Sequence, residues 1–261
     1  MDSGTSKGAS RKRKSSDANG DGKDARPTQR MILKWHDYWT KVTMSGFFDE
    51  VKNKSVRNDQ LEEWLRFRQL LSGRLVLACT RLKKAGLVLP CVDILEEDND
   101  WLNQCASDLG IDSSPQAARL SQVKDIIEYL DKITVLDSDL TAAAVGIWAI
   151  LFSCWQGWRL LTQRAGSEMD ENFGSIAGQL AREEKMEPLL ETATLLDNRL
   201  TPDKMKAAED VFCGALQRIS EFYEELLFRG WTEETMRCKK CGRFGHVDAK
   251  CLFKAKAARP T

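Results

Sequence analysis

The stretch LTAAAVGIWAILFSCWQGW, from Leu140 to Trp158, contains 19 residues and no charged side chain. A membrane-spanning helix needs about 20 mainly apolar residues, so the length is at the lower limit for a span. Ser153 and Gln156 interrupt the apolar run, and Asp139 and Arg159 adjoin its ends. We interpret the segment as the buried central helix of a bundle, with a membrane span as the alternative.

A second regular pattern follows Thr201-Pro202, where a capping residue precedes a proline at the start of a helix. Gly230 is the expected end of this helix. Its apolar residues alternate in steps of three and four: Met205, Ala208, Phe212, Ala215, Ile219, Phe222 and Leu226. This heptad spacing suits either the inward face of a single bundle or a contact between copies. We therefore consider a homo-oligomer formed through residues 202–229.

The segments before and between these two also carry helix signals. Aromatic residues at 35–39 favour a first helix anchored to the core, or else a surface that stacks bases. Asp59 and Glu62 have the spacing of a capping box, and Ser114-Pro115 resembles another helix start. Further helices are expected at 91–106 and 168–186. The fold class predicted is all-α, a multi-helix bundle.

Charge divides the chain into parts, although the total is zero. Residues 1–30 carry a net charge of +4 and almost no large apolar side chains, which predicts a disordered basic tail. Residues 31–230 form the expected acidic α-helical domain, 237–253 a separate small module, and 254–261 a basic tail. An acidic body is a poor match for a phosphate backbone over its whole surface.

Compartment and targeting are suggested by cysteines and by one basic run. Cys79, Cys91, Cys105, Cys154 and Cys213 are odd in number and scattered, so we expect reduced residues in the nucleus and/or cytoplasm. The four basic residues at 11–14 suit nuclear import, contact with a polyanion, or no role. They are Arg11, Lys12, Arg13 and Lys14.

The carboxyl-terminal part has the pattern C-x2-C-x4-H-x4-C. Its residues Cys238, Cys241, His246 and Cys251 provide three thiolates and one imidazole, a complete tetrahedral set for one Zn²⁺ per chain. A site with no open position is structural and not catalytic.

Together with Gly242 and Gly245, these residues resemble the CCHC zinc knuckle of retroviral nucleocapsid proteins and cellular RNA-binding proteins. The resemblance covers residues 238–251 and implies binding of single-stranded RNA or DNA. It places base contacts at Lys239 and Val247, with Phe244 as the possible aromatic surface. From Arg237 to Thr261 the net charge is +7, which favours phosphate contacts. The basic residues expected to contribute are Lys240, Arg243, Lys250 and Lys254.

The function predicted is therefore a non-enzymatic protein that binds single-stranded nucleic acid, with RNA favoured. The helical domain would mediate self-association or partner binding, as in a viral or retroelement RNA-associated protein. The alternative is an adaptor whose helical domain binds a protein and whose zinc module makes a protein contact or localises it. An enzyme is disfavoured because the sequence shows no P-loop, no glycine-rich dinucleotide turn and no open metal site.

Overall fold

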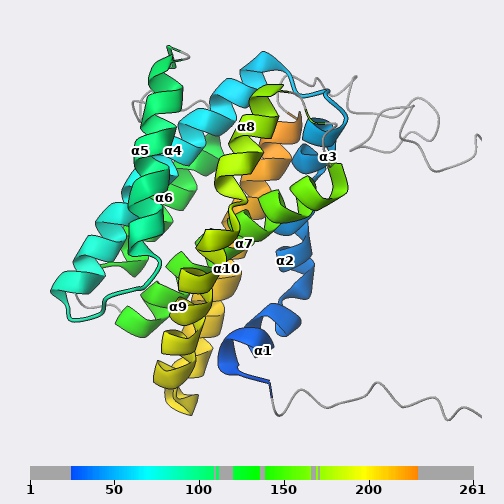
Figure 1. Cartoon of the computed structure of the whole chain (residues 1–261). Coiled ribbons are helices and arrows are strands. Elements are labelled where there is room, and N and C mark those ends of the chain that lie inside the picture. The colour runs from blue at the N-terminus through cyan, green and yellow to red at the C-terminus, as the bar shows by residue number, and fades with distance from the viewer. Residues whose placement is uncertain are drawn as a thin grey trace, which may run out of the picture.

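The computed structural model describes residues 25–108, 110–111, 120–135, 139–165, 169 and 171–228. Over these ranges the secondary structure is helical and contains no strand, which confirms the predicted all-α bundle (Figure 1). The described helices are α1 (Pro27–Lys34), α2 (His36–Thr43), α3 (Gly46–Lys52), α4 (Asn58–Lys84), α5 (Val92–Asp108), α6 (Ser121–Ile133), α7 (Leu140–Ala165), α8 (Glu171–Leu180), the 3-10 helix η4 (Glu183–Lys185), α9 (Met186–Arg199) and α10 (Pro202–Phe228).

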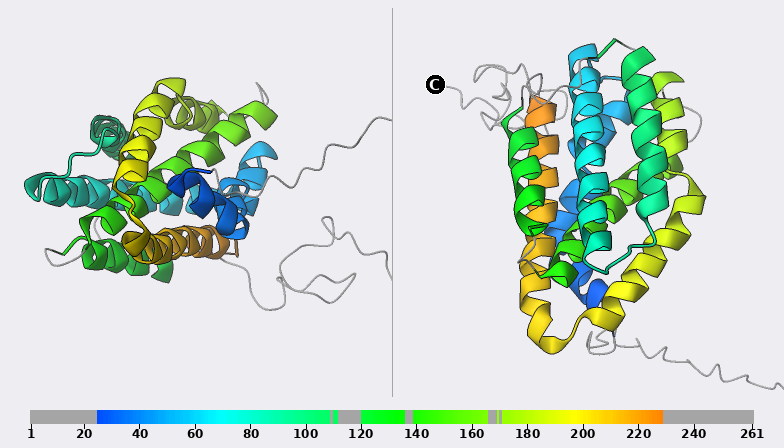
Figure 2. Two further views of the ribbon diagram at one scale, coloured as in Figure 1. Left: turned by 90° about the horizontal axis from the view of Figure 1, so that it is seen from below. Right: turned by 90° about the vertical axis from the view of Figure 1, so that its left-hand side faces the viewer.

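Helix α7 lies in the middle of the bundle and contacts α2, α3, α4, α8, α9 and α10 (Figures 1 and 2). It is long and apolar enough to cross a membrane, but 78% of its most apolar window is buried inside the protein. Gly146 and Gly157 allow neighbouring side chains to approach the helix closely. A Cβ at Gly157 would lie 2.7 Å from the Phe48 ring, and one at Gly146 would lie 2.7 Å from Val211. These contacts agree with a buried central helix.

The heptad pattern of α10 is explained within one chain. Ala208, Phe212, Ala215, Ile219 and Phe222 are fully buried, and much of α10 packs along α7. The face suggested for contact between copies is therefore occupied by the protein's own core. A homo-oligomer through residues 202–229 stays a prediction.

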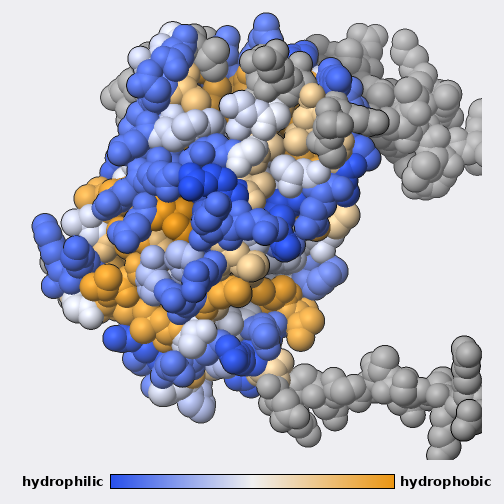
Figure 3. All heavy atoms as spheres, viewed as in Figure 1, coloured by the Kyte–Doolittle hydropathy of each residue, from blue (hydrophilic) through white to orange (hydrophobic). Residues whose placement is uncertain are grey.

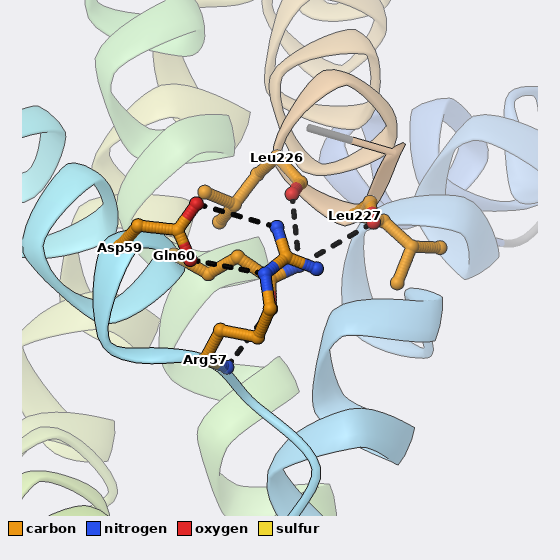
Figure 4. A network of polar contacts seen from close by, with 5 residues as sticks. All are labelled: Arg57, Asp59, Gln60, Leu226 and Leu227. Carbon is orange, nitrogen blue, oxygen red and sulfur yellow. Dashed lines mark hydrogen bonds and ion pairs between the residues drawn. The ribbon is translucent and has the colours of Figure 1, made fainter. Parts of the chain in front are cut away.

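The capping box expected at Asp59 and Glu62 is wrong, because α4 begins at Asn58. The Gln60 side chain instead accepts a hydrogen bond from the Arg57 backbone N–H at 3.0 Å, while the Asp59 carboxylate is occupied by the Arg57 guanidinium at 3.0 Å (Figure 4). The Gln60 amide also donates to the carbonyl oxygens of Leu226 and Leu227, at 3.1 and 3.3 Å. One side chain thus joins the start of α4 to the end of α10.

The folded body begins before residue 31, because α1 starts at Pro27. Thr28 is buried, and its backbone N–H and hydroxyl donate to the Asp197 carboxylate at 2.8 and 3.2 Å. In α2, the Trp39 ring lies 5.4 Å from Phe152 of α7, which fits the anchoring interpretation of the aromatic cluster. The Ser114-Pro115 signal lies outside the described residues, and α6 begins at Ser121.

The surface of the described body is mixed. The face drawn in Figure 3 alternates polar regions with apolar patches, which are more extensive in its lower half. The large apolar residues that are exposed come from several helices and loops: Leu33, Met44, Leu77, Val88, Val135, Met186 and Leu190. Such scattered exposure is normal for a globular protein and does not identify a binding surface.

Candidate functional site

A small cavity of about 30 Å³ lies inside the bundle, between α4, α5, α7 and the chain from α8 to α9. Its volume holds a water or a few atoms in the conformation described. The residues that line it are Arg68, Cys91, Ile94, Leu95, Asp98, Leu151, Cys154, Trp155, Trp158, Leu180, Lys185 and Leu189. Charged groups, two thiols and indole rings therefore meet where an apolar core would be expected.

Helical spacing explains how these side chains converge. On α7, Cys154 and Trp158 are four residues apart, so they lie on one face of the helix. On α4, Trp64 and Arg68 have the same spacing. Asp98 comes from α5, and Lys185 from the short η4 helix that follows α8.

Arg68 and Cys154 line the cavity, and Tyr223 lies next to the Cys154 thiol. Arg68 is 6% exposed, and Cys154 and Tyr223 are buried. Burial raises the pKa of the Cys154 thiol, while the Arg68 guanidinium partly opposes that rise. Burial also raises the pKa of the Tyr223 hydroxyl, and the neighbouring thiol raises it further. At neutral pH both groups are protonated and can donate hydrogen bonds.

A buried ion pair forms another part of the lining. The Lys185 ammonium donates to the Asp98 carboxylate, and the Lys185 side chain is 5% exposed. Burial lowers the pKa of Lys185, and the Asp98 carboxylate raises it in opposition. Nearer the surface, Arg182 pairs with Glu97. Asp98 is therefore already engaged by its own cation.

One indole ring contributes a polar hydrogen without an acceptor. The Trp64 and Trp158 rings pack edge to face, with centroids 5.1 Å apart. The Trp158 Nε1 atom is buried and has no hydrogen-bond partner among the described residues. The Trp64 indole lies against the Tyr223 hydroxyl. Trp155, in contrast, donates to the Arg182 carbonyl at 3.0 Å. An unpartnered buried donor is costly, which makes this arrangement unusual for a purely structural core.

The site residues predicted from the sequence lie elsewhere in the chain. The metal ligands Cys238, Cys241, His246 and Cys251 lie outside the described residues. So do the nucleic-acid contacts Lys239, Lys240, Arg243, Phe244, Val247, Lys250 and Lys254, and the import candidates Arg11, Lys12, Arg13 and Lys14. Among the residues that the structure does describe, no cluster of three or more His, Cys, Asp or Glu could hold a metal ion.

Sequence reasoning missed the cavity residues because they come from separate helices. Cys154 was expected to be a reduced core cysteine, and it is buried and free of a disulfide. It also lines the cavity with Arg68 and Lys185, residues 86 and 31 positions from it in the chain. No spacing pattern joins residues so distant. The one available signal was the thiol within the long uncharged segment.

The fold is that of a single helical bundle already known from solved structures. The chain superimposes on a TenA homologue from Pyrococcus furiosus with a TM-score of 0.67 and 12% identity, covering 77% of this chain and 99% of that one. For a TenA homologue from P. horikoshii OT3 the TM-score is 0.60, with 7% identity and coverage of 77% and 98%. For a TenA family transcription regulator from Silicibacter these values are 0.62, 13%, 77% and 96%. No protein-family model and no curated protein sequence matches the chain.

These likenesses correct the functional interpretation of the sequence. The identification as a CCHC zinc-knuckle protein is wrong, because the folded body has the architecture of TenA proteins. The nucleic-acid-binding function and the viral or retroelement assignment are wrong for the same reason, and these likenesses give no support to the adaptor alternative. These predictions applied the function of a 14-residue motif to a helical body that does not contain the motif.

The exclusion of an enzyme is also wrong. It rested on missing sequence motifs, whereas the helical body has the fold of TenA homologues, which none of those motifs describes. The bundle also holds a cavity whose described lining includes two thiols, two cations and a carboxylate. Groups of this kind can support chemistry without any contiguous motif.

Proposed function

We propose that the helical body binds a small polar molecule in the cavity around Arg68 and Cys154. The observation that carries this proposal is the burial of Arg68, Asp98, Lys185 and Cys154 around one cavity. Well-packed apolar residues would stabilise a bundle at least as well as buried charges do. Concave sites with a few convergent polar groups and perturbed pKa values are typical of ligand binding.

A cavity-filling variant tests the proposal. In a thermal-shift screen of small polar compounds, ligands of the cavity should raise the unfolding temperature of the wild type. Cys154→Met should abolish those shifts, because the longer side chain occupies the cavity. Cys213→Met is the matched control, since Cys213 is half-buried on α10 and does not line the cavity. Hits that stabilise Cys154→Met as strongly as the control would refute this binding site.

Nucleophilic catalysis by Cys154 is the second candidate, favoured by the thiol that lines the same cavity as a carboxylate. A thiol attacks as the thiolate, so its proton must be transferred to a base. Asp98 is the carboxylate among the described cavity residues, and Lys185 holds it in place. Once a ligand is known, Cys154→Ser should retain binding and lose turnover. If Cys154→Ser turned over the ligand as fast as the wild type, catalysis by Cys154 would be refuted and only a binding role for the cavity would remain.

A further inference from the structure

Arg68 differs from the other buried cations described in this protein. Arg66 pairs with the Glu63 carboxylate at 3.0 Å, and Lys185 pairs with Asp98. Arg68 is equally buried, yet it makes no ion pair with a carboxylate among the described residues. Its Nε atom is buried without a hydrogen-bond partner. An uncompensated guanidinium is among the most unfavourable groups to bury.

The surroundings of Arg68 add donors and few acceptors. Trp158 lines the same cavity, and its Nε1–H has no acceptor. The Trp64 indole, a further donor, lies against the Tyr223 hydroxyl beside Cys154. The Cys154 sulfur is the neighbour that faces Arg68, but a protonated thiol is a weak acceptor without charge. The Asp98 carboxylate is taken by Lys185.

The excess positive charge and the excess of hydrogen-bond donors in the cavity can therefore be satisfied by the same kind of ligand. Among the described lining residues, Arg68 and Lys185 exceed the one carboxylate, that of Asp98, by one positive charge. A water molecule could accept hydrogen bonds here but would leave the guanidinium unneutralised. A planar oxyanion supplies two acceptor oxygens and the missing negative charge, and it matches the fork of a guanidinium.

We propose that the cavity binds the carboxylate group of a small anionic ligand, with Arg68 as its counter-charge and Trp158 as an additional donor. This inference rests on the proposed function and assigns the chemical class of its ligand. The cavity volume of about 30 Å³ admits a group of a few atoms. The carboxylate end of a ligand fits that size, and a larger remainder would require the cavity to open.

Three small molecules of matched shape and different charge test the inference: formate, formamide and formamidinium. Each has one carbon between two oxygen or nitrogen atoms, so size does not distinguish them. The readout is the NMR shift of the Trp158 indole N–H in ¹⁵N-labelled protein, assigned with Trp158→Phe, at constant ionic strength. We expect saturable shifts with formate, at least tenfold weaker binding of formamide, and no binding of formamidinium.

Substitutions of Arg68 complete the test. Arg68→Met should abolish the formate-dependent shift and leave the unfolding temperature of the free protein unchanged or higher, because an unpaired buried charge is removed. Arg68→Lys keeps the charge and should bind formate at least tenfold more weakly, because the fork is lost. Arg74→Met is the control, since Arg74 lies on the same helix outside this cavity and pairs with Asp131.

The outcomes separate this inference from the proposed function. Saturable binding of formamide or formamidinium but not of formate would overturn the anionic class and leave a small-molecule site. Formate binding that survives Arg68→Met with Trp158 still shifted would overturn the role of Arg68. Absence of formate binding, with cavity ligands found in the thermal-shift screen, would refute the carboxylate and retain the binding function. Failure of both experiments would refute both.

Discussion

At the scale of single residues, burial determines the chemistry of this protein. Cys154 and Tyr223 are ordinary residue types whose pKa values rise because water is excluded around them. Arg68 keeps its charge in the same environment and therefore needs a partner. The sequence gives the identity of these residues, but their protonation and reactivity follow from neighbours that are distant in the chain.

Removing the Tyr223 hydroxyl should alter how stability depends on pH. The folded-state pKa of Tyr223 lies above its ordinary value of 10.0, so its contribution is fully present below pH 10 and is lost as pH rises. Between pH 10 and 11, the free energy of unfolding of the wild type should fall more steeply than that of Tyr223→Phe. The difference in slope should approach about 1.4 kcal/mol per pH unit. Denaturant titrations at several pH values measure it, and parallel slopes would contradict the prediction.

At the scale of elements, helix periodicity was the most informative feature of the sequence. The apolar pattern from Met205 to Leu226 predicted α10, and the uncharged run from Leu140 predicted α7. Helix starts were predicted less well. The expected cap at Asp59 was wrong because the Arg57 side chain takes the carboxylate. The Gln60 side chain caps the helix instead. Its amide also donates to a carbonyl oxygen near the end of α10, 166 residues further along the chain.

The link between α4 and α10 should contribute measurably to stability. Gln60→Ala should lower the free energy of unfolding by about 1–3 kcal/mol, because buried carbonyl oxygens of Leu226 and Leu227 lose their donor. Hydrogen exchange should also accelerate in the last turn of α10. Gln69→Ala is the matched control, because Gln69 is half-buried on the same helix and donates to the Asn103 side chain, not to α10. The free energy of unfolding of Gln69→Ala should stay within about 0.5 kcal/mol of the wild-type value. Equal effects of the two substitutions would refute the link.

At the scale of the whole molecule, the chain combines two parts that the sequence describes unequally. The helical body between Pro27 and Phe228 has a known architecture, although its identity to solved TenA structures is 7–13%. The carboxyl-terminal cysteine and histidine pattern has a clear chemical meaning but covers few residues. The function predicted from this short motif was therefore applied to the whole chain, although the fold of the larger helical body does not support it.

The zinc prediction can be separated from the body. We expect one Zn²⁺ per chain, reduced to near zero by Cys241→Ser, because that substitution removes one of four ligands. The described body holds no cluster of metal ligands, so chelation should leave its unfolding temperature unchanged. Elemental analysis of the purified protein and thermal unfolding with and without chelator measure these outcomes. A metal-free wild-type protein would end the zinc prediction.

By itself, the sequence determined that the body is helical and which segments are most buried, because helix formation and amphipathic periodicity are local properties. It also determined the spacing of the cysteine and histidine pattern near the carboxyl terminus. The tertiary structure alone decided that Arg68, Asp98, Cys154 and Lys185 share one cavity. Their meeting depends on how four separate elements pack, and the strength of a charge or a hydrogen bond there depends on the water that packing removes.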